Sequence, residues 1–247
     1  VHAIRDAEPR TFFRQRGAQR AIPNQRVMGI KFMGNPREGI VARPGWLFSE
    51  HNRKSLIYSK TATTLRTLQS LVGDEKMDAI MKSYFERWKF RHPRGSDFMA
   101  HLKSELNAAT DSVFARQAYG LFETGIYRAV VLDYAVTRIS NETLFAAQGN
   151  FGEQADSFKY EDGSGRRETL STLEVQRKGD WIFPVDILVT FEDGSTQTLQ
   201  WSGEEGLKTF QFRDMPKIVS AQIDPEQKLS LDVDLNNNSM TLQPRTA

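Results

Sequence analysis

The residues that could do chemistry are few, and they are scattered through the sequence. The chain has no cysteine and four histidines, which are His2, His51, His92 and His101. We expect no metal-ligand partner three or four residues from any of them, and Glu50 stands beside His51 without a second ligand. The sequence contains no H-E-x-x-H, G-x-S-x-G, P-loop or Rossmann glycine pattern. By its residues alone, the chain has no complete catalytic constellation, and each histidine is expected to be a surface or packing residue.

Tyr58 is the one side chain that we single out as a candidate catalytic group. It lies in the apolar half of an expected helix, one turn before Ala62 and two turns before Leu65. A phenol at the rim of an apolar face can donate a hydrogen bond into an adjacent cleft and stabilise a developing oxyanion. The same spacing is typical of a core tyrosine whose hydroxyl is satisfied locally. Both interpretations stay open on spacing alone.

Two tryptophans, Trp181 and Trp201, lie in the part of the chain that is expected to form strands. Exposed tryptophan rings could stack on sugars, which would indicate a carbohydrate-binding module. Tryptophan in the interior of a β-sandwich is the commoner arrangement. We therefore expect both rings to be buried.

The composition is that of an ordinary globular protein, with 39% hydrophobic and 26% charged residues. A length of 247 residues allows one large domain or two ordinary ones. No run of about 18 apolar residues occurs, so no membrane span is expected. The first residues lack the apolar core of a signal peptide. Because the numbering begins at Val1, we expect the chain to be processed or cut from a longer protein.

The net charge of +2 hides an asymmetry between the two ends of the chain. Residues 1–54 hold eleven Lys and Arg against four Asp and Glu, which is +7 and leaves −5 for the remainder. A basic segment can bind nucleic acid. Its arginines, however, are interleaved with few aromatic residues, and no nucleic-acid module is recognisable. The basic segment is therefore interpreted as solvated or partner-facing surface, without a nucleic-acid partner.

Residues 54–91 give the strongest helical pattern, and they predict two consecutive helices with a stop at Gly73 and an N-cap at Asp74. On a helical wheel, the first helix should bury Ile57, Leu65, Leu68, Leu71 and Val72 and expose Lys60, Thr63, Arg66, Thr67 and Ser70. The second should present one apolar stripe of Met77, Ile80, Met81, Tyr84, Phe85 and Trp88.

Two further helices are expected, one capped by Ser96 and one by Thr110 or Asp111. Upstream, residues 11–20 are interpreted as a short helix.

After about residue 125 the apolar period changes from 3.6 to 2, which predicts strands. The expected strands are 127–139, 170–175, 181–191 with Pro184 inside it, 196–201, 207–212, 218–223 and 229–233. Residues 191–195, Phe-Glu-Asp-Gly-Ser, predict a hairpin turn, and Asn236–Asn238 should end the set. The predicted fold class is α+β, a helical segment followed by an antiparallel β-sandwich. The expected domains are residues 1–124 and 125–247.

The segment from Ile57 to Leu68, IYSKTATTLRTL, resembles the Y-x-K-G-A-x-x-L-x-x-L helix of the gluzincin zinc aminopeptidases, of the aminopeptidase N and leukotriene A4 hydrolase type. The similarity continues through residues 72–74 and 96–98. Residues 182–185, 191–194, Trp201 and 223–225 are similar to the small β-sandwich that follows the catalytic domain in bacterial members. The resemblance covers roughly residues 40–240. One residue departs from the pattern, because Thr61 stands where the family has glycine.

In that family the tyrosine of this helix donates its hydroxyl to the tetrahedral intermediate of peptide hydrolysis, and the matching residue is Tyr58. The family's zinc ligands, on an H-E-x-x-H helix and a following helix with a glutamate, lie upstream and do not occur here. The resemblance therefore implies the C-terminal part of a bacterial zinc aminopeptidase, a hydrolase fragment that is inactive alone and holds no cofactor itself. It implies zinc and a peptide substrate in the full-length protein, a missing N-terminal catalytic region as partner, and an extracytoplasmic location.

A second hypothesis comes from a different class of protein. The chain could be a non-catalytic interaction module of helices and a β-sandwich, whose uncovered helix faces bind a protein partner. An H-E-x-x-H motif encoded a short way upstream would favour the peptidase, and a natural start near Val1 would favour the interaction module.

Overall fold

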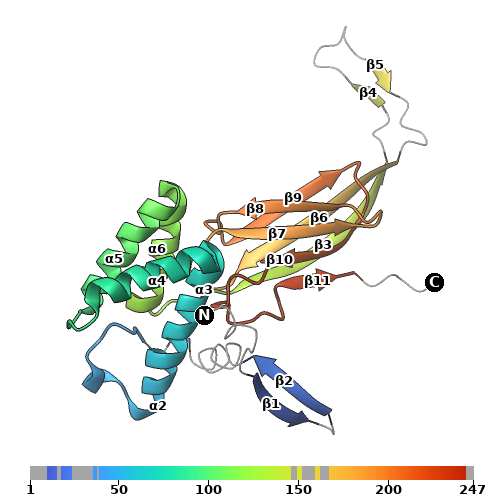
Figure 1. The fold of residues 1–247 in the computed structure, drawn as a ribbon. Coiled ribbons are helices and arrows are strands. Elements are labelled where there is room, and N and C mark those ends of the chain that lie inside the picture. The colour runs from blue at the N-terminus through green and yellow to red at the C-terminus, as the bar shows by residue number, and fades with distance from the viewer. Residues whose placement is uncertain are drawn as a thin grey trace. The chain divides into compact units, whose positions relative to one another are not determined.

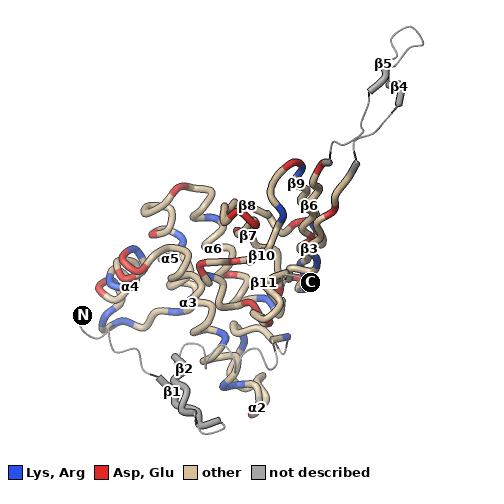
Figure 2. Tube along the Cα trace, turned by 90° about the vertical axis from the view of Figure 1, so that its right-hand side faces the viewer, with Lys and Arg blue, Asp and Glu red and all other residues tan. Residues whose placement is uncertain are grey.

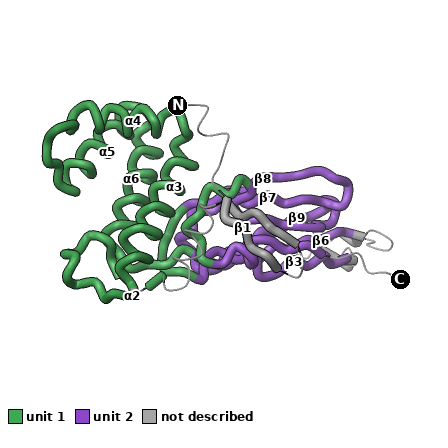
Figure 3. Tube along the Cα trace, turned by 60° about the horizontal axis from the view of Figure 1, so that its bottom comes forward, with its two compact units in different colours: residues 1–132, 179–183, 226–233 green, residues 133–178, 184–225, 234–247 purple. Residues whose placement is uncertain are grey.

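The chain divides into two compact units (Figure 1 and Figure 3). This computed structural model describes residues 10–15, 18–23, 36–37, 39–145, 149–151, 159–161 and 167–242; for residues 10–15, 18–23, 51, 145, 149–151, 159–161 and 167 it describes the backbone only. Unit 1 comprises residues 1–132, 179–183 and 226–233, and unit 2 comprises residues 133–178, 184–225 and 234–247. The boundary expected at 124/125 falls inside a helix, and two later segments belong to unit 1.

Unit 1 is built from helices. They are η2 (Gly45–Leu47), α2 (Glu50–Arg53), the π-helix η3 (Lys54–Lys60), α3 (Thr61–Val72), α4 (Asp74–Trp88), α5 (Gly95–Ala109) and α6 (Ser112–Tyr127). The core of this unit consists of apolar side chains from all four of the longer helices: Leu68, Val72, Met77, Ile80, Met99, Leu102, Leu106, Ala115, Ala118 and Phe122. Edge-on ring contacts join Tyr84 to Phe98 at 5.0 Å and Phe98 to Phe122 at 5.8 Å. The expected group of four packed helices is present.

The helix ends follow local chemistry. Gly73 has φ +93° and ends α3 as predicted, but it also precedes α4 directly, so Asp74 is the first residue of α4 and not its N-cap. Asp111 caps α6, because its carboxylate accepts from the backbone N–H groups of Val113 and Phe114. The prediction of Ser96 as a cap is wrong: α5 begins at Gly95, and the Asp97 carboxylate accepts from the Arg94 N–H at 2.7 Å.

The expected apolar stripe of α4 is only partly buried. Met77 and Ile80 lie in the core, whereas Met81 and Phe85 are exposed. The stripe is therefore wider than the surface that α3 and α5 cover within the described structure. Basic and acidic residues are interspersed along this helix (Figure 2). No described helix has the length and apolar character to cross a bilayer.

Residues 179–183 and 226–233 join unit 1 through backbone and side-chain bonds. The Trp181 N–H donates to the Val131 carbonyl at 2.9 Å, and the Val131 N–H donates to the Asp180 carboxylate at 2.7 Å. The other oxygen of Asp180 pairs with Arg37 at 2.9 Å. Residues 229–233 were expected to form a strand, but they contribute only an isolated parallel bridge between Leu132 and Asp232.

Unit 2 is an antiparallel β-sandwich. One sheet has the order β11-β10-β7-β8 and the other β3-β6-β9. The strands are β3 (Tyr134–Phe145), β6 (Arg167–Arg177), β7 (Val185–Phe191), β8 (Thr196–Trp201), β9 (Leu207–Arg213), β10 (Ile218–Ile223) and β11 (Ser239–Thr241). The two sheets face each other, since Tyr134 packs edge-on against Trp201 at 5.2 Å and Phe191 against Phe212 at 5.5 Å. The predicted α+β class with an antiparallel sandwich is confirmed.

Several strand predictions are confirmed and others are corrected. The hairpin between β7 and β8 turns at Gly194, which has φ +83°, and the Asp193 carboxylate accepts from the Ser195 N–H at 2.9 Å. Pro184 precedes β7 and does not interrupt it. The strand expected over 127–139 begins only at Tyr134, because α6 continues to Tyr127. Asn236–Asn238 do not end the set, because β11 follows them.

Two short pairs of strands lie outside these two sheets. Residues 11–20 were expected to be helical, but β1 (Arg10–Gln15) and β2 (Ala18–Pro23) pair antiparallel, so that prediction is wrong. β4 (Gly149–Phe151) and β5 (Lys159–Glu161) form the other pair. Most of the basic segment 1–54 lies outside the residues whose side chains the structure describes.

Asn141 ties the two sheets of unit 2 together. Its side chain on β3 accepts from the Ile218 N–H of β10 at 2.9 Å and donates to the Ile218 carbonyl at 2.9 Å. The same amide oxygen accepts from the Ser171 hydroxyl of β6 at 2.7 Å. The amide therefore takes the place of a backbone neighbour at the point where the register of β10 is irregular.

We expect Asn141→Ala to lower the free energy of unfolding by roughly 2–3 kcal/mol, because both polar groups of Ile218 lose a partner. Thr143→Ala, on the same strand at an exposed position, should change it by less than about 0.5 kcal/mol. Urea unfolding at constant slope would measure both. Equal, small effects would show that the amide does not hold the sheets together.

Candidate functional site

Tyr58 lies in an unusual helical segment. Residues Lys54–Lys60 form a π-helix between α2 and α3, and the Tyr58 carbonyl accepts from the Thr61 N–H. π-Helices are rare and are often found at functional sites. The Tyr58 side chain is 65% exposed, so its hydroxyl is not sealed in the interior. The alternative of a core tyrosine is therefore wrong.

Thr61 stands at the junction of the π-helix and α3. Its hydroxyl lies 3.5 Å from the Leu56 carbonyl, five residues earlier. The side chain is only partly buried, and α3 continues from it without a break. The residue that departs from the family pattern is thus accommodated in a continuous helix.

The buried face of this helix differs from the predicted one. The side chains that are sealed from solvent are Leu56, Ser59, Lys60, Thr63, Thr64, Thr67, Leu68 and Val72. Lys60, Thr63 and Thr67 were expected to be exposed. Ile57, Leu65 and Leu71 were expected to be buried and are only partly so. The threonines can be buried because their hydroxyls donate to the carbonyl four residues earlier, at 2.8 Å for Thr63 and Thr64 and 3.0 Å for Thr67.

Lys60 is the residue that the sequence analysis missed. Its side chain is 0% exposed, and its ammonium donates to the carbonyls of Arg128 at 2.8 Å and Gly39 at 3.3 Å. Arg128 follows the last residue of α6, where helix carbonyls lack partners within the helix and the helix dipole favours a cation. The signal that could have found it is the row 56-60-64-68-72, whose spacing of four is that of a buried stripe.

The loop that carries Gly39 is fastened to the same end of α6. The N–H groups of Val41 and Ala42 both donate to the Ile126 carbonyl at 3.0 Å. Gly39 itself has φ +149°, a conformation that side chains rarely adopt, and a Cβ there would lie 3.1 Å from the Arg43 guanidinium. The two carbonyls that receive the Lys60 ammonium are therefore held by a common structure.

α3 and α6 approach closely enough for this contact because of Gly125. A Cβ at Gly125 would lie 2.6 Å from Thr64 Cγ2 and 3.2 Å from the Trp181 ring. Thr64 in turn bonds to the Lys60 carbonyl. Glycine on α6 therefore permits the helix packing that brings the Arg128 carbonyl to Lys60.

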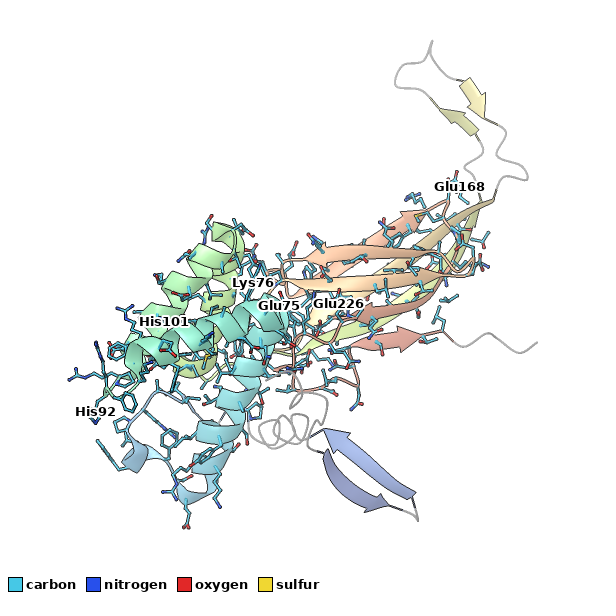
Figure 4. All side chains as sticks on the ribbon, viewed as in Figure 1. Glu75, Lys76, His92, His101, Glu168 and Glu226 are labelled. Atoms are coloured by element: carbon cyan, nitrogen blue, oxygen red, sulfur yellow. The ribbon has the colours of Figure 1, made fainter. Side chains whose placement is uncertain are left out.

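A second group of polar side chains lies between α4 and α5, where Figure 4 labels His101. His101 Nε2 is 3.0 Å from the Ser83 hydroxyl and 3.1 Å from the Ile80 carbonyl, and Ser83 lies 3.2 Å from the Glu105 carboxylate. Since a carbonyl only accepts, Nε2 donates when it bonds to Ile80 and cannot then act as a base toward Ser83. Glu105 follows His101 by four residues, so the expected lack of a partner at that spacing is wrong, but the cluster is a packing network.

The other residues that the sequence analysis singled out are the remaining histidines and the two tryptophans. His92 is exposed after the end of α4 (Figure 4), while His2 and the side chain of His51 lie outside the described residues. Trp181 and Trp201 are 4% and 2% exposed, so both are buried as predicted and neither offers a face to a sugar ring. Across the described residues, no group of three or more His, Asp or Glu side chains could hold a metal ion.

No protein-family model matches the sequence, and no curated protein matches it. The resemblance to the gluzincin aminopeptidases therefore stays a prediction.

We expect Gly125→Ala to destabilise the protein by roughly 1–3 kcal/mol, because the new methyl group overlaps Thr64. Gly120→Ala is the matched control on the same helix, where a Cβ meets nothing within 4 Å, and it should stabilise by about 0.5–1 kcal/mol. Thermal or urea unfolding would measure both. Thr64→Ser removes the methyl group that lies closest to the new Cβ, so the double variant Thr64→Ser/Gly125→Ala should recover part of the lost stability. If Gly125→Ala and Gly120→Ala stabilised the protein equally, the close packing at Gly125 would be contradicted.

Burial lowers the pKa of Lys60 from 10.5 to about 8. The unfolded chain keeps this proton to higher pH than the folded chain, so the free energy of unfolding should rise between pH ~8 and ~10.5, by up to about 3 kcal/mol. Lys60→Met removes the titrating group, and the difference between the two proteins in urea unfolding isolates its contribution. The same pH dependence in both proteins would mean that Lys60 is not desolvated.

Proposed function

We propose that the chain is the C-terminal part of a gluzincin-type zinc aminopeptidase, in which Tyr58 donates a hydrogen bond to the oxyanion formed during peptide hydrolysis. The observation that carries the proposal is the exposed phenol on an anchored π-helix: Tyr58 is 65% exposed, and Lys60, two residues later, is held by two carbonyls. The resemblance of residues 57–68 supplies the role. By itself the chain hydrolyses nothing.

The chemistry assigned to Tyr58 is electrostatic. A phenol O–H that is directed at the carbonyl oxygen of the scissile bond forms a stronger hydrogen bond as that oxygen gains negative charge. Its exposure leaves the donor available to a substrate, and its helix sets the direction from which the side chain extends. Zinc, held outside this chain, would supply the activated water.

Large apolar side chains are exposed on unit 1, and they support a partner that covers it. They are Trp46, Leu47, Met81, Phe85, Phe90 and Val113. Exposed apolar residues of this size are typical of interaction surfaces. In the peptidase proposal the partner is the N-terminal catalytic region.

The same side chains favour the second candidate, a non-catalytic interaction module. That module would use the exposed apolar residues for a protein partner and would have no need for Tyr58 as a donor. The two candidates therefore differ in what a change at Tyr58 does.

We expect Tyr58→Phe to lower kcat by about 10²- to 10³-fold, with little change in KM, in a protein extended to include the upstream H-E-x-x-H region. The measurement is hydrolysis of an aminoacyl-anilide by the zinc-loaded protein. Tyr127→Phe, another exposed tyrosine of unit 1, should leave kcat unchanged.

An extended protein that binds zinc and hydrolyses the anilide equally well with and without the Tyr58→Phe substitution would remove Tyr58 from the mechanism. An upstream region without H-E-x-x-H would leave the interaction module as the function.

A further inference from the structure

We propose that Lys60 is a positioning residue for Tyr58: its buried side chain fixes the rotation of the π-helix and thereby the direction of the phenol. The catalytic meaning of this inference rests on the proposed function, but the positioning itself concerns this chain alone.

The two side chains lie on opposite sides of one short segment. Tyr58 and Lys60 are two residues apart in the seven-residue π-helix, which separates them by roughly half a turn. Lys60 is sealed in the interior, and Tyr58 faces outward. Because both belong to one helical segment, a contact that holds Lys60 in place also sets the direction of the Cα–Cβ bond from which the Tyr58 phenol extends.

The rotation of this segment needs a fixed point. A π turn contains one residue more than an α turn, so its conversion to α-helix would rotate the preceding residues by about 100° relative to α3. Tyr58 lies before the junction at Thr61 and would rotate with them. An anchor at Lys60, the last residue of the π-helix, opposes that change.

The anchor binds two segments that are remote in sequence. The Lys60 ammonium donates to the Arg128 carbonyl at 2.8 Å and to the Gly39 carbonyl at 3.3 Å. The first belongs to the C-terminal end of α6 and the second to the loop that is fastened there through Ile126. A neutral amine at this place also has hydrogens to donate to these two carbonyls.

The absence of cysteine from the chain allows a sharp test. In Lys60→Cys the thiol is unique, and alkylation with bromoethylamine in the unfolded state, followed by refolding, gives a side chain of nearly the length of lysine with its amine restored. Lys60→Met keeps the bulk and lacks the amine. Lys54→Met, at an exposed lysine of the same π-helix, is the matched control.

The readout in the chain itself is the ¹⁹F resonance of 3-fluorotyrosine placed at position 58. Lys60→Met should shift or broaden this resonance, Lys54→Met should not, and the alkylated Lys60→Cys protein should return it to the wild-type position. In the extended, zinc-loaded protein, Lys60→Met should lower kcat by about 10²-fold with KM little changed, and alkylated Lys60→Cys should recover most of the loss.

A folded Lys60→Met protein with the wild-type resonance and kcat overturns the inference, and so does a perturbation that the restored amine does not reverse. If Lys60→Met does not fold, Gly39→Ala decides, because its strained φ displaces one accepting carbonyl: an unmoved Tyr58 resonance overturns the inference. A moved resonance together with no effect of Tyr58→Phe on kcat would retain the positioning and refute the proposed peptidase role.

Discussion

The structure around Tyr58 depends on one contact. The buried Lys60 ammonium donates to the carbonyls of Arg128 and Gly39. Removing an ammonium group from water is unfavourable, and this desolvation lowers the pKa of Lys60. The Arg128 carbonyl at the end of α6 offsets part of this cost, because carbonyls there lack partners within the helix, and the Gly39 carbonyl accepts a second bond. The contact also requires that α3 and α6 lie very close, which Gly125 permits. One buried charge thus links a glycine, a helix end and a loop.

This constraint explains why the helical wheel selected the wrong face. The wheel assigns lysine and threonine to solvent, which is correct when their polar atoms have no partner inside. Here the hydroxyls of Thr63, Thr64 and Thr67 bond within their own helix, and Lys60 bonds to a segment 68 residues away. The first kind of bond could be anticipated from sequence, because it is local. The second could not, since it depends on where α6 lies.

The same division between local and remote causes separates the predictions that were confirmed from those that were wrong. The Asp-Gly hairpin, the Gly73 stop and the Asp111 cap are set by a few neighbouring residues. The first two were predicted, and Asp111 was one of the two caps expected for its helix. Strands 196–201 and 218–223 were both predicted to the residue. The predictions for residues 11–20 and 229–233 were wrong. The first range carries parts of two strands that pair with each other, and the second forms only an isolated bridge to Leu132. The burial of Trp181 and Trp201 was predicted because tryptophan is commonly buried in a β-sandwich. The partners of the two rings could not be predicted, since they depend on how distant segments pack.

The geometry around Tyr58 bears on the choice between a peptidase and an interaction module. An aromatic side chain that only buries apolar area against a partner tolerates rotation, because the hydrophobic effect is non-directional. A hydrogen-bond donor to an oxyanion does not, because its strength depends on the direction of the O–H. A buried lysine that fixes the helix is unnecessary for the first role and useful for the second. The exposed side chains of Phe85 and Phe90 suit either function, so it is the anchored turn, and not the exposed apolar surface, that favours the oxyanion donor.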